Sequence, residues 1–318
     1  MLLNKNIILL LIAAGFGVPD AAAQCLSSVN PVGGTENLLV LEKKSLRVIT
    51  FYKHSMGRQY YEGDHHADFN LIDRAFYNNL TYFMGYGLNN KLALETELGY
   101  FINKTQVYNT EPEYKLRGYG FSNLVISTRY GLYAENFKRV FITLAVGLKI
   151  PTSRKPMSVD HVELPVEVQP TMGSYGLVMN TTWVKENSGK GMRFFLTNRI
   201  EYHFENNKEY RPGTAIYTSG YVSKHIMANR VKGDWTTILQ LRNEIRMHDE
   251  IAGEIKESSG SVLFFVVPQL NYVIREKWNL SALLDIPVYQ NFNGTQLGAG
   301  YGITLSMART FNLSNQNK

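Results

Sequence analysis

The sequence predicts an all-β protein, a transmembrane antiparallel up-and-down β-barrel of about 12 strands. Three observations predict it: twelve segments alternate apolar and polar residues, the connectors between them alternate in length, and the chain opens with an export signal. The composition agrees, since 44% of the 318 residues are hydrophobic although the mean hydropathy is only −0.19. No apolar run of about 20 residues follows the first segment, which excludes a bundle of membrane helices.

Residues 1–23 have the three parts of a signal peptide. Lys5 precedes the apolar stretch Ile7–Ala14, and Ala21–Ala23 supply the small residues of a cleavage site. We therefore expect the mature chain to begin at Gln24, and residues 24–45 to form an N-terminal periplasmic segment. Lipidation of Cys25 is the alternative, which the larger residue Gln24 in front of it disfavours.

From residue 46 onward, alternation with a period of two marks each expected strand, because successive side chains of a strand point to opposite faces. In the third strand, Leu94 and Leu98 fall on the face opposite Glu95 and Glu97. The barrel would cover 46–311 and leave a short C-terminal tail, 312–318. The expected strands are 46–54, 77–88, 92–103, 121–132, 140–150, 170–184, 192–205, 214–226, 235–248, 261–274, 278–288 and 297–311.

The connectors divide into two classes by length. Each connector after an odd-numbered strand is longer than the one that follows it: 55–76 and 104–120 are long, whereas 89–91 and 133–139 are short. Outer-membrane barrels have short turns on the periplasmic side and long loops outside. A soluble β-sandwich also alternates, but it has no reason to separate its loops in this way. The pattern favours the cell outer membrane of a Gram-negative bacterium, with both termini in the periplasm.

Charged residues lie mid-strand opposite the apolar faces, where they would line a wet lumen. Two interpretations stay open: a constriction whose transverse field orients dipolar or anionic solutes, or opposite charges that pair and fill the barrel. The lumen-lining candidates are Glu95, Glu97, Arg129, Lys149, Arg193, Arg199, Glu201, His203, Arg242, Glu244, Arg246 and His248. Aromatic residues near strand ends are expected to form interfacial girdles; they are Tyr77, Tyr82, Tyr100, Tyr130, Trp183, Tyr202, Tyr217, Trp235, Tyr272, Trp278 and Tyr289.

Three groups of motifs stand in the middle of the chain: Gly118–Leu124 followed by Thr128–Tyr130, then Gly147–Thr152, then Leu164–Pro165 with Gln169–Ser174. In order and spacing they resemble the signatures of the outer-membrane channel family named for the MetA pathway of phenol degradation. The resemblance covers about residues 118–184 and implies an outer-membrane channel for the diffusion of small, organic or aromatic solutes. It names no substrate.

The same motifs also have an architectural interpretation. Gly118 and Gly120 would permit the dihedral angles of a loop that re-enters a strand, while Pro151 would end pairing after the fifth strand and Pro170 would delay it before the sixth. The chain departs from the family pattern at Asn123, Ser153 and Met172.

The first long loop carries candidate ligand-binding side chains. Arg58, Tyr60 and Tyr61 suit a loop that packs into the barrel mouth or grips an aromatic or sugar ligand. Imidazoles and carboxylates can bind a metal, but adjacent histidines rarely ligate one ion. We therefore expect no metal, and the weak candidates for such a site are Asp64, His65 and His66.

The sequence also bears on nucleic-acid binding, catalysis and a purely structural role. The net charge of +6 is dispersed along the chain, so we expect no nucleic-acid partner. The expected partners are outer-membrane lipid and a small solute. We expect no cofactor, and the oligomeric state is open.

An outer-membrane phospholipase would need a base beside a nucleophile on the lipid side. His203, His225 and His248 can each be assigned to the inward face, so we expect no catalytic residues and no enzyme. A structural or partner-binding barrel with a filled lumen is the alternative to a channel.

Overall fold

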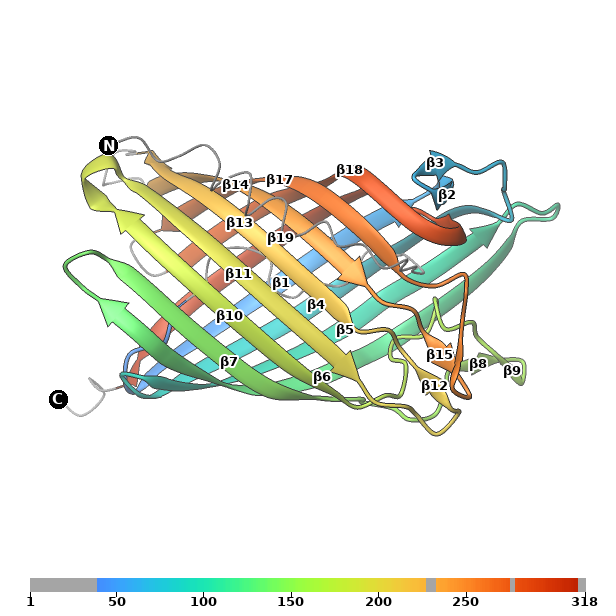
Figure 1. Cartoon of the computed structure of the whole chain (residues 1–318), viewed down its shortest axis with the longest axis horizontal. Coiled ribbons are helices and arrows are strands. Elements are labelled where there is room, and N and C mark those ends of the chain that lie inside the picture. The colour runs from blue at the N-terminus through green and yellow to red at the C-terminus, as the bar shows by residue number, and fades with distance from the viewer. Residues whose placement is uncertain (1–38, 227–232, 275–277, 314–318) are drawn as a thin grey trace.

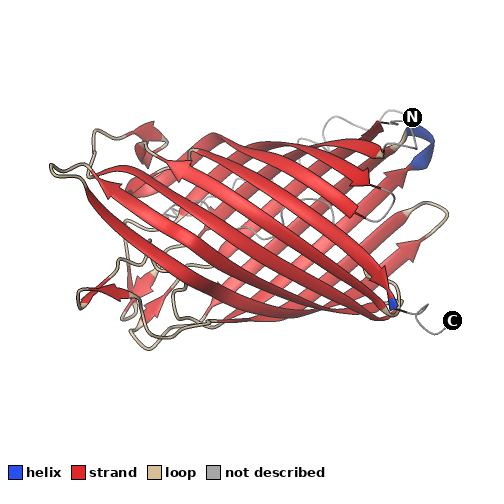
Figure 2. Ribbon diagram, turned by 180° about the vertical axis from the view of Figure 1, so that it is seen from behind, coloured by secondary structure: helices blue, strands red, loops and turns tan. Residues whose placement is uncertain are grey.

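The computed structural model describes residues 39–226, 233–274 and 278–313. In these residues twelve long strands form one closed antiparallel barrel, with the strands inclined to its long axis (Figures 1 and 2). The predicted fold class is confirmed. The barrel strands are β1 (Ser45–Gly57), β4 (Ile72–Asn89), β5 (Leu92–Tyr108), β6 (Tyr114–Glu135), β7 (Val140–Ile150), β10 (Gly176–Asn187), β11 (Met192–His203), β13 (Ala215–Ile226), β14 (Asp234–Arg246), β17 (Ser261–Ile274), β18 (Trp278–Leu297) and β19 (Tyr301–Asn312).

Neighbouring strands in the chain are neighbours in the barrel, and the first strand closes it on the last. Ser45 of β1 pairs with Asn312 of β19, so the barrel begins and ends at the same end. We call this the turn end, because it also carries the short connectors 90–91 and 136–139 and the 3₁₀ turn η1 (Ser188–Lys190). The opposite end is the loop end. Among the described residues, no helix is long and apolar enough to cross a membrane.

The predicted signal peptide, 1–23, and Cys25 lie outside the described residues, as do most of the N-terminal segment and residues 314–318 of the tail. The last residues before β1 enter the turn end of the barrel. There Leu39 packs against Val184, Phe195, Tyr221 and Ile238, an apolar cluster on the inner wall.

Seven short strands lie at the loop end (Figure 1). The short strands β12, β15 and β16 form a small three-stranded sheet, and β8 pairs with β9. Their bounds are β2 (Tyr60–Gly63), β3 (His65–His66), β8 (Ser158–Val159), β9 (Val162–Glu163), β12 (Tyr210–Arg211), β15 (Glu250–Ile251) and β16 (Glu254–Ile255).

At the loop end several strands run further than the sequence predicts. The expected connector 104–120 is mostly strand, because β5 continues to Tyr108 and β6 begins at Tyr114. Likewise β18 runs through the expected connector 289–296, whereas β10 begins at Gly176 instead of residue 170. In these extensions the alternation disappears, because consecutive side chains are buried: Thr105, Gln106 and Val107 of β5 are all covered by protein. Periodicity therefore marks the membrane-facing part of a strand and not its full length.

The outer surface of the barrel is apolar. Leu148 of β7 is 56% exposed and Leu241 of β14 is 60% exposed, and large hydrophobic side chains at equivalent positions surround the barrel. Most of the predicted girdle aromatics are on this surface, but Tyr77 and Tyr217 are buried inside. That prediction was wrong for these two residues because nearness to a strand end does not determine the face; the period of two places both on the inward side.

The inner surface is divided into an apolar and a polar wall. On β17 the inward side chains Leu263, Phe265 and Val267 are buried and form a cluster with Leu283 and Phe292 of β18. The opposite wall, built from β5, β6, β7 and β11, carries most of the inward charged residues. Four others, Lys53, Arg242, Glu244 and Asp285, are on β1, β14 and β18, beside the apolar side chains. Apolar and charged side chains therefore both face the lumen.

Candidate functional site

The structure brings most of the predicted lumen candidates together inside the barrel. Glu97 and Lys149 are partly buried and contact the others. The fully buried candidates are Glu95, Arg129, Arg199, Glu201, His203, Arg242 and Glu244. In a water-poor interior such charges are stable only when they are paired.

Arg199 carries the longest connection across the lumen. Its Nη1 and Nη2 donate to the two carboxylate oxygens of Glu97, at 2.9 and 3.2 Å, and its Nε donates to Glu201 at 2.7 Å. Glu97 is on β5 and Arg199 on β11, with β6, β7 and β10 between them in the wall. Lys149 Nζ adds a bond of 2.5 Å to Glu201. These side chains therefore reach across the lumen from one part of the wall to another.

Two further ion-paired groups complete the arrangement. Asp285 accepts from Lys53 at 2.8 Å and from Arg242 at 3.0 Å, and Arg129 forms a two-pronged pair with Glu95 at 2.6 and 3.1 Å. Together these residues form what we call the ion-pair network, with five cations and five carboxylates: Lys53, Glu95, Glu97, Arg129, Lys149, Arg199, Glu201, Arg242, Glu244 and Asp285.

Lys53 and Asp285 belong to this network but are missing from the sequence candidates. Asp285 was detectable, because it is a carboxylate in mid-strand among apolar residues and on the same face as Ser281. Lys53 was harder to assign, because both faces of β1 carry large apolar residues: Ile49 and Phe51 are inside with Lys53, while Tyr52 is outside.

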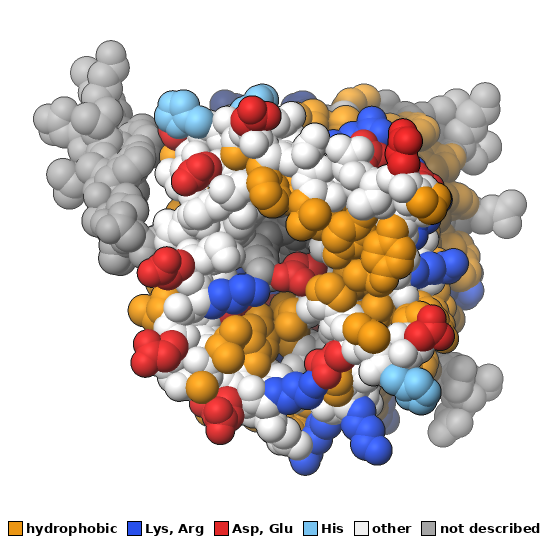
Figure 3. Space-filling model, turned by 90° about the vertical axis from the view of Figure 1, so that its right-hand side faces the viewer, with side chains coloured by type: hydrophobic (Ala, Val, Ile, Leu, Met, Phe, Trp, Pro, Cys, Tyr) orange, Lys and Arg blue, Asp and Glu red, His pale blue; other side chains and the backbone are white. Residues whose placement is uncertain are grey.

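The ion-pair network separates two cavities, and the inward face of β11 shows their order. Arg193 and Phe195 line an inner cavity of about 580 Å³ at the turn end. Arg199, Glu201 and His203 line an outer cavity of about 180 Å³ toward the loop end. Figure 3 shows the loop end, whose face is hollowed at its centre and surrounded by acidic, basic and hydrophobic side chains.

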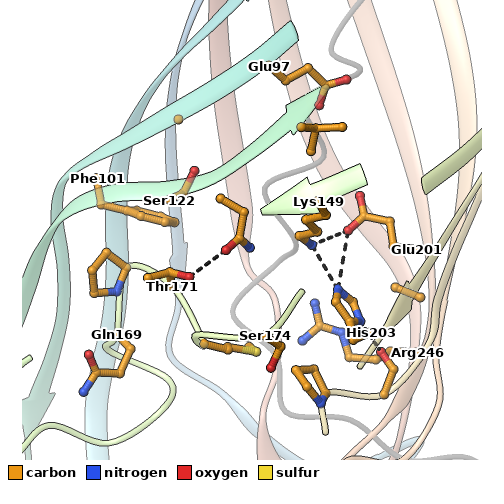
Figure 4. Close-up of a pocket in the computed structure, with 18 of the residues that line it drawn as sticks. Glu97, Phe101, Ser122, Lys149, Gln169, Thr171, Ser174, Glu201, His203 and Arg246 are labelled. Atoms are coloured by element: carbon orange, nitrogen blue, oxygen red, sulfur yellow. Dashed lines mark hydrogen bonds and ion pairs between the residues drawn. The ribbon is translucent and has the colours of Figure 1, made fainter. Parts of the chain in front are cut away.

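The outer cavity is partly built by the connector 151–175, which folds back toward the barrel wall (Figure 4). A side chain on Gly118 would lie 2.0 Å from the carbonyl oxygen of Val168, so the connector can pack there only against glycine. Gln169 then fastens the connector by accepting from Met157 N at 2.8 Å and donating to the carbonyl of Leu164 at 2.8 Å. These motif residues therefore have a structural role, since they hold the connector in place.

Details of the motif region confirm part of this interpretation. Gly120 has φ of +125°, which L-residues rarely adopt, and β7 ends at Ile150, directly before Pro151. Asn123, a departure from the family pattern, lines the outer cavity and accepts a hydrogen bond from Thr171 at 2.6 Å.

The other three lumen candidates do not belong to the ion-pair network. Arg193 is at the turn end, where its side chain is 60% exposed and pairs with Glu186 at 3.1 Å. Arg246 lines the outer cavity. His248 follows the end of β14, and its Nε2 lies 3.0 Å from Asn293 Nδ2.

The loop candidates are placed by packing. Tyr60 is buried with Ala75 and Leu297, and burial raises the pKa of its hydroxyl. Tyr61 packs against the cluster around Phe292, whereas Arg58 is exposed. The two tyrosines therefore hold the first long loop against the barrel.

Near them, His65 Nδ1 lies 2.5 Å from the carboxylate of Asp64, and His66 Nε2 lies 3.1 Å from the hydroxyl of Tyr61. Within the described part of the chain, no three residues of the types His, Cys, Asp and Glu are grouped to hold a metal ion.

A buried carboxylate that was not among the sequence candidates joins two connectors at the loop end. Asp249 accepts from the Tyr210 hydroxyl at 2.7 Å and from the backbone N of Gly213 at 2.7 Å. Burial, and after it the negative charge of Asp249, raise the pKa of Tyr210 well above its usual range. The connectors 204–214 and 247–260 are thus fixed to each other beside the outer cavity.

Comparison with known proteins finds several solved structures that are similar to this chain. The chain is similar to an outer-membrane channel from Pseudomonas putida F1, with a TM-score of 0.69 and 13% identity over 88% of this chain and 100% of that one. It is also similar to the β domain of the Bordetella autotransporter BrkA, with a TM-score of 0.49 and 8% identity over 85% and 100%. For the NanC porin the TM-score is 0.42, with 11% identity over 83% and 98%.

No family model and no curated protein matches the chain. At 13% identity the first likeness shows a shared fold, that of an outer-membrane channel. The closed barrel and its apolar outer surface agree with that fold, and the protein is located in the outer membrane.

Proposed function

We propose that the protein is an outer-membrane channel for small solutes, with the loop end outside the cell and the ion-pair network as its narrowest part. The observation that carries the proposal is the pair of cavities, inner and outer, on either side of the ion-pair network. A barrel built only for stability could fill this space with apolar side chains, as the wall at β17 does. Buried ion pairs add little stability compared with apolar packing, so their presence here favours a role in the passage of solutes over a role in stability.

The test is conductance in planar lipid bilayers in potassium chloride. The wild-type protein is expected to give discrete conductance steps. The variant Arg199→Ala removes the side chain that spans the lumen and should give larger steps with a shift toward cation selectivity, because Glu97 loses its partner.

The matched control is Arg193→Ala, which removes the same charge from the same face of β11 at the wide turn end. Its steps should keep the wild-type size. If Arg193→Ala enlarges the steps as much as Arg199→Ala does, the ion-pair network is not the narrowest part.

A structural barrel with a filled lumen is the second candidate, and the two-pronged pair between Arg199 and Glu97 favours it, because these side chains block the direct path. The same recordings decide between the candidates. Absence of steps from both the wild-type protein and Arg199→Ala would establish the filled barrel and overturn the channel.

The proposal includes no catalysis. A hydrolase needs a histidine that can take a proton from a nucleophile, whereas His203 has its Nε2 at 3.0 Å from Lys149 Nζ and its Nδ1 at 3.3 Å from the carbonyl of Gly213. Membership of the phenol-degradation channel family, a signal peptide and a Gram-negative source remain part of the same proposal. They rest on the sequence motifs and on the fold.

A further inference from the structure

We infer that the outer cavity is a binding site for a small organic anion, one carboxylate attached to an apolar, aromatic-sized body. The inference deepens the proposed function by naming a class of solute for the channel. It rests on three features of the cavity: its charge balance, a buried hydroxyl with no partner, and an apolar lining.

The charge balance of the outer cavity is positive. It is lined by four cations, Lys104, Lys149, Arg199 and Arg246, and by three carboxylates, Glu97, Glu201 and Asp249. Each of the three carboxylates already accepts at least one hydrogen bond from the protein. An anion entering the cavity therefore meets a net positive charge.

Lys104 is the cation that remains for a ligand. Within the described part of the chain it forms no ion pair; its Nζ donates to the carbonyl of Gln169 at 3.1 Å and lies 5.4 Å from the centre of the Phe101 ring. Glu167, on the same connector as Gln169, pairs instead with Lys256 at 3.7 Å. An ammonium group has three donors, so Lys104 can donate to a carboxylate without losing its contact with the connector.

Ser174 supplies a second polar group. It is only 3% exposed, it lines the outer cavity, and its Oγ has no hydrogen-bond partner among the described residues. Leaving a buried hydroxyl unpaired is unfavourable. A ligand oxygen would remove this penalty, and Figure 4 shows Ser174 beside the cavity together with Thr171 and His203.

The remaining lining suits a flat apolar body. Tyr77 and Phe101 meet edge to face, with ring centres 5.8 Å apart, and Val125, Pro170 and Met172 add apolar surface. The volume of about 180 Å³ is below the roughly 300–1,000 Å³ of sites for drug-sized ligands. The site therefore fits a compact ligand such as an aromatic monocarboxylate.

Benzoate is the probe, and its binding to the detergent-solubilised full-length protein can be measured by isothermal titration calorimetry. Lys104→Met should weaken benzoate binding by about tenfold or more, the loss expected for one charge-assisted hydrogen bond. Lys104→Arg should retain most of the affinity. The matched control is Lys115→Met on the same β5–β6 hairpin, where the side chain is 52% exposed and outside the cavity; it should bind like the wild type.

Two further ligands separate charge from shape. Benzyl alcohol, which keeps the ring and lacks the charge, should bind more weakly than benzoate and should not respond to Lys104→Met. Acetate, which keeps the charge and lacks the ring, should also bind more weakly. Equal binding of benzoate by the wild type and Lys104→Met, or no benzoate binding at all, would overturn the inference.

Heat-dependent electrophoretic mobility confirms that each variant has folded into a barrel before its binding is compared. The outcome is independent of the channel test. Benzoate can bind to a barrel that does not conduct, and a conducting barrel can fail to bind it.

Discussion

Asp285→Asn tests whether the interior of the barrel is as dry as the packing suggests. The carboxylate of Asp285 pairs with Lys53 at 2.8 Å and with Arg242 at 3.0 Å, and these three side chains are only 5–7% exposed. Removing one partner of a buried ion pair leaves an uncompensated charge and typically lowers the free energy of unfolding by about 3–5 kcal/mol. Lys53 loses its carboxylate while Arg242 keeps Glu244, so we expect a loss within that range.

Glu186→Gln is the matched control. Glu186 also serves two cations, Arg139 and Arg193, at 3.2 and 3.1 Å, but their side chains are 53% and 60% exposed. Exposed pairs contribute about 0–1 kcal/mol. The two variants should therefore differ by at least about 2 kcal/mol.

Urea unfolding of the protein in lipid vesicles measures both variants, with tryptophan fluorescence as the signal. The three tryptophans of the chain suit this assay, because Trp183 and Trp235 are exposed on the outer surface and will report on release from lipid. Adding Lys53→Met to Asp285→Asn should recover part of the loss, since it removes the cation that has lost its carboxylate. If Asp285→Asn costs no more than Glu186→Gln, the ion-pair network is hydrated and the reasoning fails.

Two other predictions concern the connector and the outer surface. Gly118→Ala should displace the connector 151–175 and make it more sensitive to protease, because the new Cβ meets Val168 at 2.0 Å; Gly220→Ala, which meets nothing within 4 Å, should not. Leu241→Arg should destabilise the barrel by about 2–4 kcal/mol in urea unfolding, the cost of an arginine facing lipid. Val162→Arg, which is 70% exposed on the loop strand β9, should have almost no effect if only the barrel wall contacts lipid.

The sequence was sufficient to predict the twelve barrel strands because their signal is local. One face meets lipid, so a period of two follows directly from the solvent on each side. Glu95 and Glu97 were assigned inward on that basis, and both contact arginines inside the barrel. Strand ends outside the lipid lack this alternation of apolar and polar residues, so the sequence predicts β5 and β18 to be shorter than they are.

The partners of the charged residues could not be predicted, because they depend on the curvature and register of the closed barrel. Arg199 and Glu97 are 102 positions apart in the chain and are separated by three strands in the wall. Nothing local to either residue indicates that they meet. The folded-back connector is similar, since Val168 approaches Gly118 only after the barrel has formed.

The geometry also bears on the two interpretations of the lumenal charges. A transverse field needs acidic and basic groups on opposite sides of an open lumen, so that a solute passes between them. Here the acids and bases bond to each other at 2.5–3.0 Å, and five cations balance five carboxylates, so the dipoles are short and leave little field in the lumen. Discrimination between solutes would then depend on the outer cavity, where Lys104 forms no ion pair within the described residues, and the ion-pair network would set how easily any solute passes.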